Sequence, residues 1–267
     1  MKDVTYIAAF PKSGITYLNY MLFHLLFDAA QDVERIDSDY IFDLHESLAR
    51  VPPPGDTPRY VKIHFGFGPG LPLLGRASRA VYLVRDPIDV MMSVWDFKHL
   101  TGEEGLLRSS ETERQAKFAA FRQRWLSTGG AEFAFAGSWV QNVRSWLEET
   151  SLPLLVVRYE TLKNAPASQL ERVLKFLGRP ASAERIAKAV AAGSVENMRG
   201  QESREIANRK SGTFYRPFLA AGYAQGYRFV GKINQNSYDK VLSPAERGLA
   251  DRIFAPVLAR VRERSEA

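Results

Sequence analysis

The hydrophobic positions along the chain form short apolar runs, separated by longer stretches in which apolar residues recur with the period of a helix. The apolar runs predict four strands, over Val4–Phe10, Arg59–His64, Ala80–Val84 and Leu154–Val157. The longer stretches predict three helices, over Thr16–Ala30, from Pro87 to about Lys98, and over Glu246–Glu263. Strands that alternate with helices at these separations indicate βαβ units with right-handed crossovers. The expected fold class is therefore α/β, with a central, mostly parallel sheet flanked by helices.

Two segments show no clear period. Thr101–Gln115 is polar and charged, and Asn197–Asn236 is rich in Gly, Arg and aromatic residues. We expect both to be mobile coverings over a site, because long connections lie on the surface and often carry function. The chain has 267 residues, 45% of them hydrophobic, which is enough to bury a full core. We therefore expect a single domain over residues 1–267.

Composition narrows the class of partner. The chain carries 36 Lys and Arg against 30 Asp and Glu, a net charge of +6 that suits an anionic ligand but is too small to indicate nucleic acid. It has no cysteine, which excludes disulfides, thiolate catalysis and Cys-ligated zinc. No His, Asp or Glu spacing demands a metal, so we expect none. The most apolar segment, Ile15–Ala30, contains Asn19 and Asp28 and falls short of the ~20 residues that span a bilayer, and Met1–Phe10 lacks the apolar core of a signal peptide.

The loop after the first predicted strand has the parts of an anion site. Phe10–Tyr17 lacks the G-x-x-x-x-G-K-S/T spacing of a nucleoside triphosphatase. Lys12 supplies a point charge, Ser13, Gly14 and Thr16 supply backbone and hydroxyl donors, and the following helix directs its positive end at the loop. The alternative is an ordinary strand-to-helix turn with a solvated lysine.

One of the four histidines is placed for proton transfer. His64 ends a predicted strand, and Lys62, two residues earlier, lies on the same face of that strand. Histidine has an unperturbed pKa of ~6.5 and can therefore accept a proton near neutral pH. From the residues alone, a structural role for His64 is an equal alternative. His24, His45 and His99 are expected to be structural or solvated.

Several segments, in order, resemble the sulfotransferases that use 3′-phosphoadenosine 5′-phosphosulfate (PAPS). Pro11–Tyr17 is similar to their first cofactor signature, P-K-S-G-T-T-W, with Ile15 in place of a threonine and Tyr17 in place of the tryptophan. Tyr60–His64 is similar to the segment with the family's lysine and catalytic histidine, and Val84–Ser93 to its 3′-phosphate motif. Further blocks match at Gly137–Trp146, Arg158–Glu160 and Ser194–Met198. The resemblance covers the chain from about Val4 to Ala250.

The resemblance implies a fold like that of the P-loop nucleoside triphosphatases and a cytoplasmic enzyme that transfers a sulfuryl group from PAPS to a hydroxyl or amine, releasing 3′-phosphoadenosine 5′-phosphate (PAP). It implies that Lys12 neutralises the bridging oxygen, that His64 is the general base and that Lys62 is a second charge stabiliser. Arg85 and Ser93 would bind the 3′-phosphate. The full set of expected cofactor-binding residues is Lys12, Ser13, Gly14, Ile15, Thr16, Tyr17, Arg85, Ser93, Tyr159, Ser194, Arg209, Lys210 and Lys232.

Alternatives remain for single residues and for one block. Arg85 could instead pair with Asp86 or Asp89, and Tyr159, expected to bond the adenine, could simply pack at a strand end. The family's closing R-K-G-x-x-G-D-W block has two incomplete counterparts. They are Arg209–Gly212, which keeps the basic pair, and Gly231–Tyr238, which keeps the spacing to Leu242–Pro244.

Two other functions compete with this interpretation, and the acceptor is open. A nucleotide or small-molecule kinase would need a Walker-type lysine and a magnesium-binding carboxylate, and a non-catalytic adenine-nucleotide-binding module would lack the base. Aromatic residues in Trp95–Phe97, Phe133–Phe135 and Phe214–Tyr215 could line an apolar acceptor pocket. Small-molecule, lipid, glycan and peptide acceptors all remain candidates, as does assembly into a homodimer.

Overall fold

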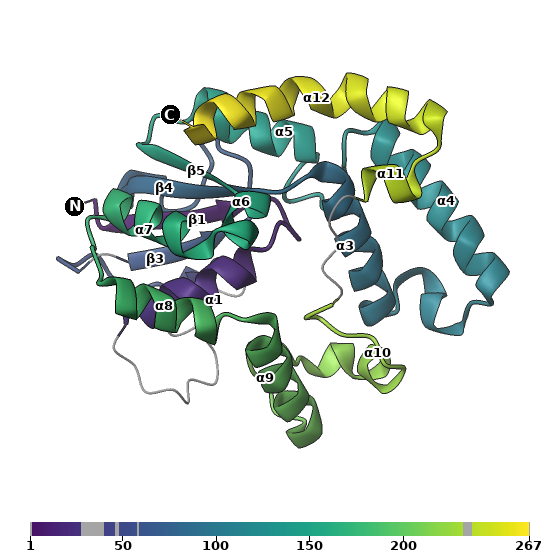
Figure 1. Ribbon diagram of the computed structural model, residues 1–267, viewed down its shortest axis with the longest axis horizontal. Coiled ribbons are helices and arrows are strands. Elements are labelled where there is room, and N and C mark those ends of the chain that lie inside the picture. The colour runs from purple at the N-terminus through teal and green to yellow at the C-terminus, as the bar shows by residue number, and fades with distance from the viewer. Residues whose placement is uncertain (1, 28–39, 46–47, 58, 232–236, 267) are drawn as a thin grey trace.

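A five-stranded sheet forms the centre of the computed structural model, which describes residues 2–27, 40–45, 48–57, 59–231 and 237–266 (Figure 1). The strands are β1 (Val4–Ala9), β2 (Ile41–Asp43), β3 (Arg59–Ile63), β4 (Ala77–Val84) and β5 (Leu154–Arg158). They lie in the order β2-β3-β1-β4-β5, and each neighbouring pair is parallel. The predicted α/β class with a parallel central sheet is confirmed. The three-residue β2 was not predicted, because so short a run carries no readable alternation.

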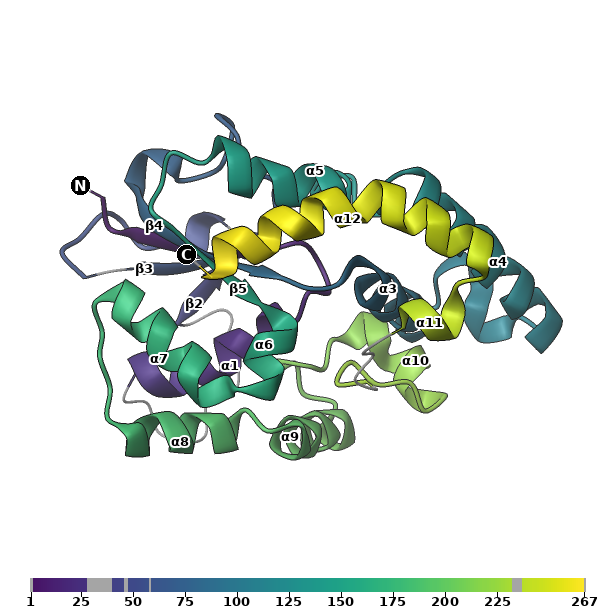
Figure 2. The same ribbon diagram turned by 45° about the horizontal axis from the view of Figure 1, so that its top comes forward.

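Helices cover both faces of the sheet (Figures 1 and 2). Alternation along β1 directs Tyr6 and Ala8 into one core and Ile7 and Ala9 into the other. The first core is closed by α3 (Pro87–Thr101), α4 (Glu111–Ser127), α5 (Trp139–Arg144) and α12 (Pro244–Glu266). The second is closed by α1 (Ile15–Leu26), α6 (Tyr159–Asn164), α7 (Pro166–Leu177) and α8 (Ala183–Ala192). Burial on both faces explains why these strands read as continuous apolar runs.

The remaining elements are short or lie beside the main layers. They are α9 (Val195–Asn208), α10 (Ala220–Ala224) and α11 (Tyr238–Val241), 3₁₀ turns over Leu48–Arg50, Leu74–Arg76, Glu103–Arg108 and Pro217–Leu219, and a π-helical turn over Ser145–Glu149. In Figure 1, α9 and α10 lie below α3, on the side of the molecule toward which the strands run. The predicted first helix ends at Leu26, and residues 28–39 lie outside the described part of the chain.

Both segments that were expected to be irregular coverings contain helices. Thr101–Gln115 includes a 3₁₀ turn and the start of α4, where Ser110 and Glu113 form a reciprocal capping box. Asn197–Asn236 includes most of α9 and all of α10. The sequence did not reveal α9 because its buried face is narrow: Met198 and Glu202 are its only buried residues. A single buried carboxylate does not read as part of an apolar stripe.

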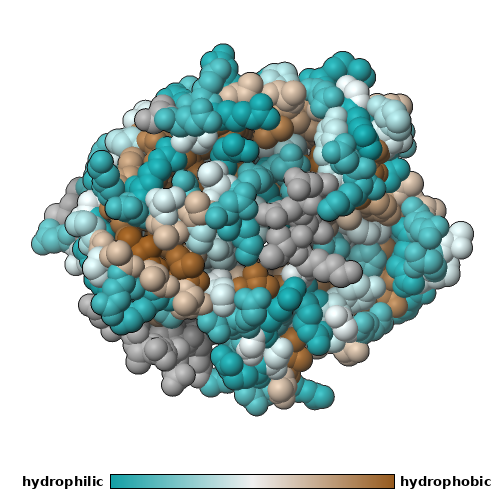
Figure 3. All heavy atoms as spheres, viewed as in Figure 1, coloured by the Kyte–Doolittle hydropathy of each residue, from teal (hydrophilic) through white to brown (hydrophobic). Residues whose placement is uncertain are grey.

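On the face shown in Figure 3, hydrophilic residues predominate and the hydrophobic patches are small and separated. Among the residues that the structure describes, no helix is long and apolar enough to cross a membrane.

Candidate active site

The carboxyl edge of the parallel sheet gathers the predicted residues. The Lys12 loop follows β1, His64 follows β3, Arg85 follows β4 and Tyr159 follows β5. β1 lies between β3 and β4, so the chain winds to one side of β1 and then to the other. Ligands of open α/β sheets bind at such switch points, outside the carboxyl ends of the strands.

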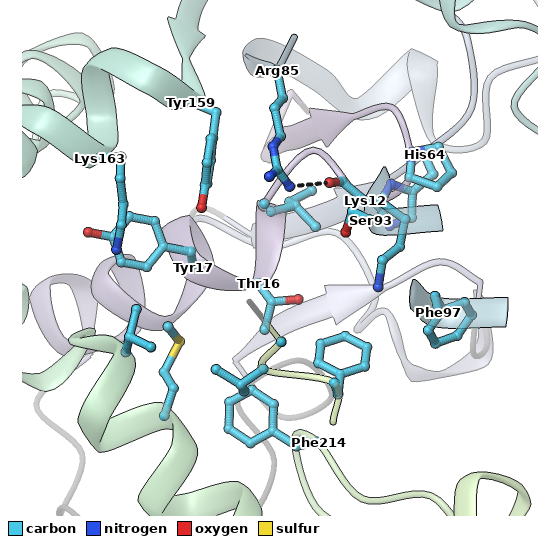
Figure 4. A pocket seen from close by; sticks show the side chains of 18 of the residues that line it. Lys12, Thr16, Tyr17, His64, Arg85, Ser93, Phe97, Tyr159, Lys163 and Phe214 are labelled. Carbon is cyan, nitrogen blue, oxygen red and sulfur yellow. Dashed lines mark hydrogen bonds between the residues drawn. The ribbon is translucent and has the colours of Figure 1, made fainter. Parts of the chain in front are cut away.

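A cavity of about 290 Å³ opens at this edge (Figure 4). Tyr17, Tyr159 and Lys163 lie toward one end of it, and His64 and Phe97 toward the other. The predicted residues that line it are Lys12, Gly14, Ile15, Thr16, Tyr17, Lys62, His64, Arg85, Ser93 and Tyr159. The sequence did not single out several other lining residues, which are Lys163, Val195, Met198, Phe229 and Val230.

The Lys12 loop has an unusual backbone conformation and unpaired donors. Lys12 adopts φ 68° and Gly14 φ 95°, both in the left-handed region that side chains disfavour. A Cβ on Gly14 would lie 2.5 Å from the Tyr159 ring, so only glycine fits there. The first turn of α1 has no capping side chain and no acidic residue. The Ser13 hydroxyl is buried and has no hydrogen-bond partner among the described residues.

The Lys12 ammonium lies between two aromatic rings. Its Nζ is 4.2 Å from the centroid of Phe97 and 4.5 Å from that of Phe229, a cation–π arrangement. Burial, followed by the nearby charge of Arg85, lowers the pKa of Lys12 to about 7. A bound anion would raise this pKa again, because it stabilises the charged form.

Arg85 forms the wall of the cavity next to this loop. Its Nη1 donates to the carbonyl of Lys12 at 3.2 Å, the dashed line in Figure 4. The guanidinium carbon is 4.5 Å from the centroid of the Tyr159 ring. The Asp86 carboxylate caps α3 by accepting from two backbone amides, and Asp89 accepts from the backbone of Ser237. Both carboxylates therefore have structural partners of their own.

His64 is held in the tautomer that a base requires. Its Nδ1 is 2.7 Å from the Ala9 carbonyl, which can only accept, so Nδ1 carries the proton and Nε2 keeps its lone pair. Its backbone N–H donates to Nε2 of His45 at 3.2 Å, and its carbonyl accepts from Asn142. Burial, aided by the Lys62 charge, lowers the pKa of His64 to about 3, so the ring is neutral at pH 7.

Lys62 has a partner that the sequence did not reveal. Its Nζ is 2.7 Å from Oδ2 of Asp43, which ends β2, and both side chains are largely buried. Burial by itself would raise the pKa of Asp43, but the Lys62 ammonium outweighs it and the pKa falls. Lys62 is thereby fixed in the cavity wall beside His64. A carboxylate at the end of a short apolar triplet, Ile41–Asp43, was the available signal.

Ser13 does not line this cavity, and three further predicted cofactor residues, Ser194, Arg209 and Lys210, lie away from it. Ser194 caps α9 by accepting from the Asn197 amide and lines a neighbouring hollow of about 500 Å³. Arg209 and Lys210 are exposed at the end of α9, and Lys232 lies outside the described residues. Of the two candidate closing segments, only the one that begins at Gly231 reaches the described cavity wall.

The family described as "Sulfotransferase domain" matches residues 2–261 of the chain. This chain belongs to the sulfotransferase family. It is 24% identical to Cytosolic sulfotransferase 8 of Arabidopsis thaliana over 91% of this chain and 76% of that one. It is 27% identical to human Sulfotransferase 1E1 over 89% of this chain and 82% of that one. The predicted family is thereby confirmed, and this sulfotransferase is an enzyme.

Solved structures show the same fold. Mouse sulfotransferase SULT7A1 complexed with PAP superposes with a TM-score of 0.68 at 21% identity, over 100% of this chain and 88% of that one. Retinol dehydratase in complex with androsterone and inactive cofactor PAP superposes with a TM-score of 0.69 at 17% identity, over 96% and 81% of the two chains. The predicted sulfotransferase fold is confirmed.

Proposed function

We propose that this sulfotransferase transfers the sulfuryl group of PAPS to a hydroxyl of a small apolar acceptor and releases PAP. The main support is that residues of the Lys12 loop, Arg85 and a neutral His64 line the same cavity. The PAP-bound solved structures of the same fold support the choice of donor. No comparable support exists for the kinase or the non-catalytic module.

The cavity fits the charge of PAPS. The lining residues include Lys12, Lys62, Arg85 and Lys163 but no Asp or Glu among the described residues. The uncapped start of α1 adds backbone donors beside the buried Ser13 hydroxyl. Helix N-termini and basic side chains together form the usual phosphate site of α/β proteins. In the described part of the chain, no group of three or more His, Asp or Glu could hold a metal ion.

The geometry supports a separate role for each of these residues. PAPS, when bound, supplies the sulfuryl group and a phosphate leaving group. His64 Nε2 accepts the proton of the acceptor hydroxyl, a role typically worth ~10²–10⁴-fold in rate. The Lys12 ammonium neutralises negative charge as it develops, and Lys62, fixed by Asp43, adds a second positive charge beside the base. Arg85 and Ser93 hold the 3′-phosphate, and Tyr159 and Tyr17 lie at the adenine end.

The acceptor end of the cavity favours an apolar compound. Phe97, Phe133 and Phe214 line the cavity, and each comes from one of the three aromatic segments named above. Trp95 instead stacks on Phe121 in the core, with ring centroids 5.4 Å apart. Next to the cavity, His45 packs 4.6 Å from Phe135, centroid to centroid. Aromatic walls of this kind bind apolar ligands by burying their nonpolar surface, and a few polar groups orient the ligand.

The cellular location and the oligomeric state of the protein are separate questions. We propose a cytoplasmic enzyme, supported by the similarity to Cytosolic sulfotransferase 8 of Arabidopsis thaliana. A homodimer, and a single domain over residues 1–267, stay predictions.

A transfer assay with radiolabelled PAPS and a panel of phenols, alcohols, amines, sugars and peptides tests this proposal. We expect label on apolar hydroxyl compounds and, in parallel, formation of PAP. The variant H64A should bind PAP like the wild type but transfer almost no label. If no member of the panel is labelled, the proposal for the acceptor is contradicted. If H64A transfers label as fast as the wild type, the proposal for the base is contradicted.

A further inference from the structure

One wall of the cavity is held by side chains of α9 that do not themselves line the cavity. The wall is Phe229–Gly231, a stretch without helix or strand structure. Oε1 of Glu202 accepts from the Phe229 amide at 2.6 Å, and Oε2 accepts from the Val230 amide at 3.2 Å. One turn earlier, the Arg199 guanidinium donates to the carbonyls of Val230 and Gly231 at 3.4 and 3.1 Å.

These contacts form a clamp of opposite charges on one helix. The carboxylate takes two backbone donors and the guanidinium takes two backbone acceptors of the same three residues. An irregular segment cannot satisfy its own backbone groups, so its path depends on such partners. Arg199 and Glu202 therefore satisfy four backbone groups of this wall.

Glu202 has the larger part in this clamp. Its side chain is only 1% exposed, and burial raises its pKa. A buried carboxylate is costly unless hydrogen bonds satisfy it, and the Phe229 and Val230 amides supply two of them. Arg199 is exposed, and one of its two bonds is long, so it contributes less. A second carboxylate on α9, Glu205, holds the Phe214 side of the cavity by accepting from three consecutive amides.

The clamp also reaches the Lys12 ammonium. Phe229, whose amide Glu202 binds, is one of the two rings that enclose Lys12 Nζ. Burial and the charges of Arg85 and Lys62 lower the pKa of Lys12, whereas the charge of Asp96 and, to a smaller extent, that of Glu202 raise it. Loss of this charge would thus change both the position of the Phe229 ring and the protonation of Lys12.

We propose that Glu202, assisted by Arg199, is a positioning residue that fixes the Phe229–Gly231 wall and thereby sets the affinity of the cavity for the donor nucleotide. The proposal rests on the proposed function, since it assumes that PAP binds in this cavity. Neither residue needs to touch the nucleotide.

Calorimetric titration with PAP compares the wild type with E202Q, R199A and the control E171Q, which makes the same exchange as E202Q at an exposed position of α7. An amide offers one acceptor where the carboxylate offers two, so E202Q should bind PAP about tenfold more weakly, the effect of losing one charge-assisted bond. R199A should lose about threefold because its bonds are exposed. E171Q should bind like the wild type.

The pH dependence of binding separates this role from simple destabilisation. Lys12 loses its charge above its pKa of about 7, so the affinity of the wild type for PAP should fall as the pH rises above that value. In E202Q the pKa of Lys12 drops further, so the fall should begin at lower pH. A variant that was merely less stable would keep the wild-type profile.

The outcomes distinguish failure of the proposed function from failure of the role proposed for Glu202 and Arg199. Wild-type protein that does not bind PAP would overturn the proposed function and the clamp with it. PAP binding by the wild type, with equal affinities and profiles for E202Q and R199A, would overturn the clamp alone. If E202Q does not fold, R199A still decides, because its exposed side chain can be removed without opening the core. Unchanged PAP affinity in R199A would then count against the proposal.

Discussion

Replacing Arg85 with Ala tests how the 3′-phosphate is recognised. The Arg85 side chain is buried at the edge of β4, bonded to the Lys12 carbonyl and packed on Tyr159. A guanidinium binds phosphate through charge-assisted and often paired hydrogen bonds. Each such bond contributes ~1.5–3 kcal/mol, so loss of two removes about 3 kcal/mol or more. The affinity of R85A for PAP should therefore fall by roughly 100-fold.

The comparison with AMP isolates this effect. AMP lacks the 3′-phosphate, so its affinity should fall much less in R85A, and the ratio of the two losses corrects for the lost contacts with Lys12 and Tyr159. R158A is the matched control. Arg158 ends the neighbouring strand β5, its Nε is 3.9 Å from Glu160, and it does not line the cavity. R158A should keep the wild-type preference for PAP.

Thermal unfolding provides the assay. A ligand at 100 times its dissociation constant adds ~2.7 kcal/mol of stability. For a chain of this size that corresponds to a shift in Tm of roughly 5–10 °C. Wild-type protein should show this shift with PAP and a clearly smaller one with AMP at the same concentration. Equal shifts for the two nucleotides would refute the recognition of the 3′-phosphate, and an unchanged preference in R85A would remove Arg85 from it.

Three further variants test the rest of the site. G14A should lose both stability and PAP binding, since its Cβ would meet the Tyr159 ring at 2.5 Å; normal PAP titration of G14A would contradict the close fit. D43N should lower kcat more than it weakens PAP binding, because Asp43 fixes Lys62 beside the base; an unchanged kcat would separate Lys62 from the chemistry. His64 is neutral in the folded protein down to about pH 3 but takes up a proton in the unfolded chain near pH ~6.5, so stability should fall as pH drops below that value. H64Q should show a shallower loss between about pH 7 and about pH 4.5 by urea unfolding, and equal slopes would show that His64 does not contribute.

The sequence by itself determined the strands and the loops that follow them. The interior positions of β1, β3, β4 and β5 are largely buried, so each strand holds a short apolar run, although β3 also carries Arg59 and Lys62. Lys12, His64 and Arg85 stand directly after such runs. Because parallel strands end at one edge of a sheet, their meeting in one cavity could be expected from the order of the motifs alone.

Only the tertiary structure decided the partners of these residues. Asp43 meets Lys62 across 19 positions, and Glu202 meets Phe229 across 27, and neither pair has a local pattern that links its members. The two candidate closing segments differ in whether a described residue reaches the cavity, and this too depends on tertiary contacts. Arg209–Gly212 keeps the basic pair of the family's closing block but does not line the cavity. Gly231 does line it, next to backbone groups that bond to Arg199 and Glu202. Local sequence records propensity and burial, whereas these contacts depend on how β2 pairs with β3 and on where α9 packs.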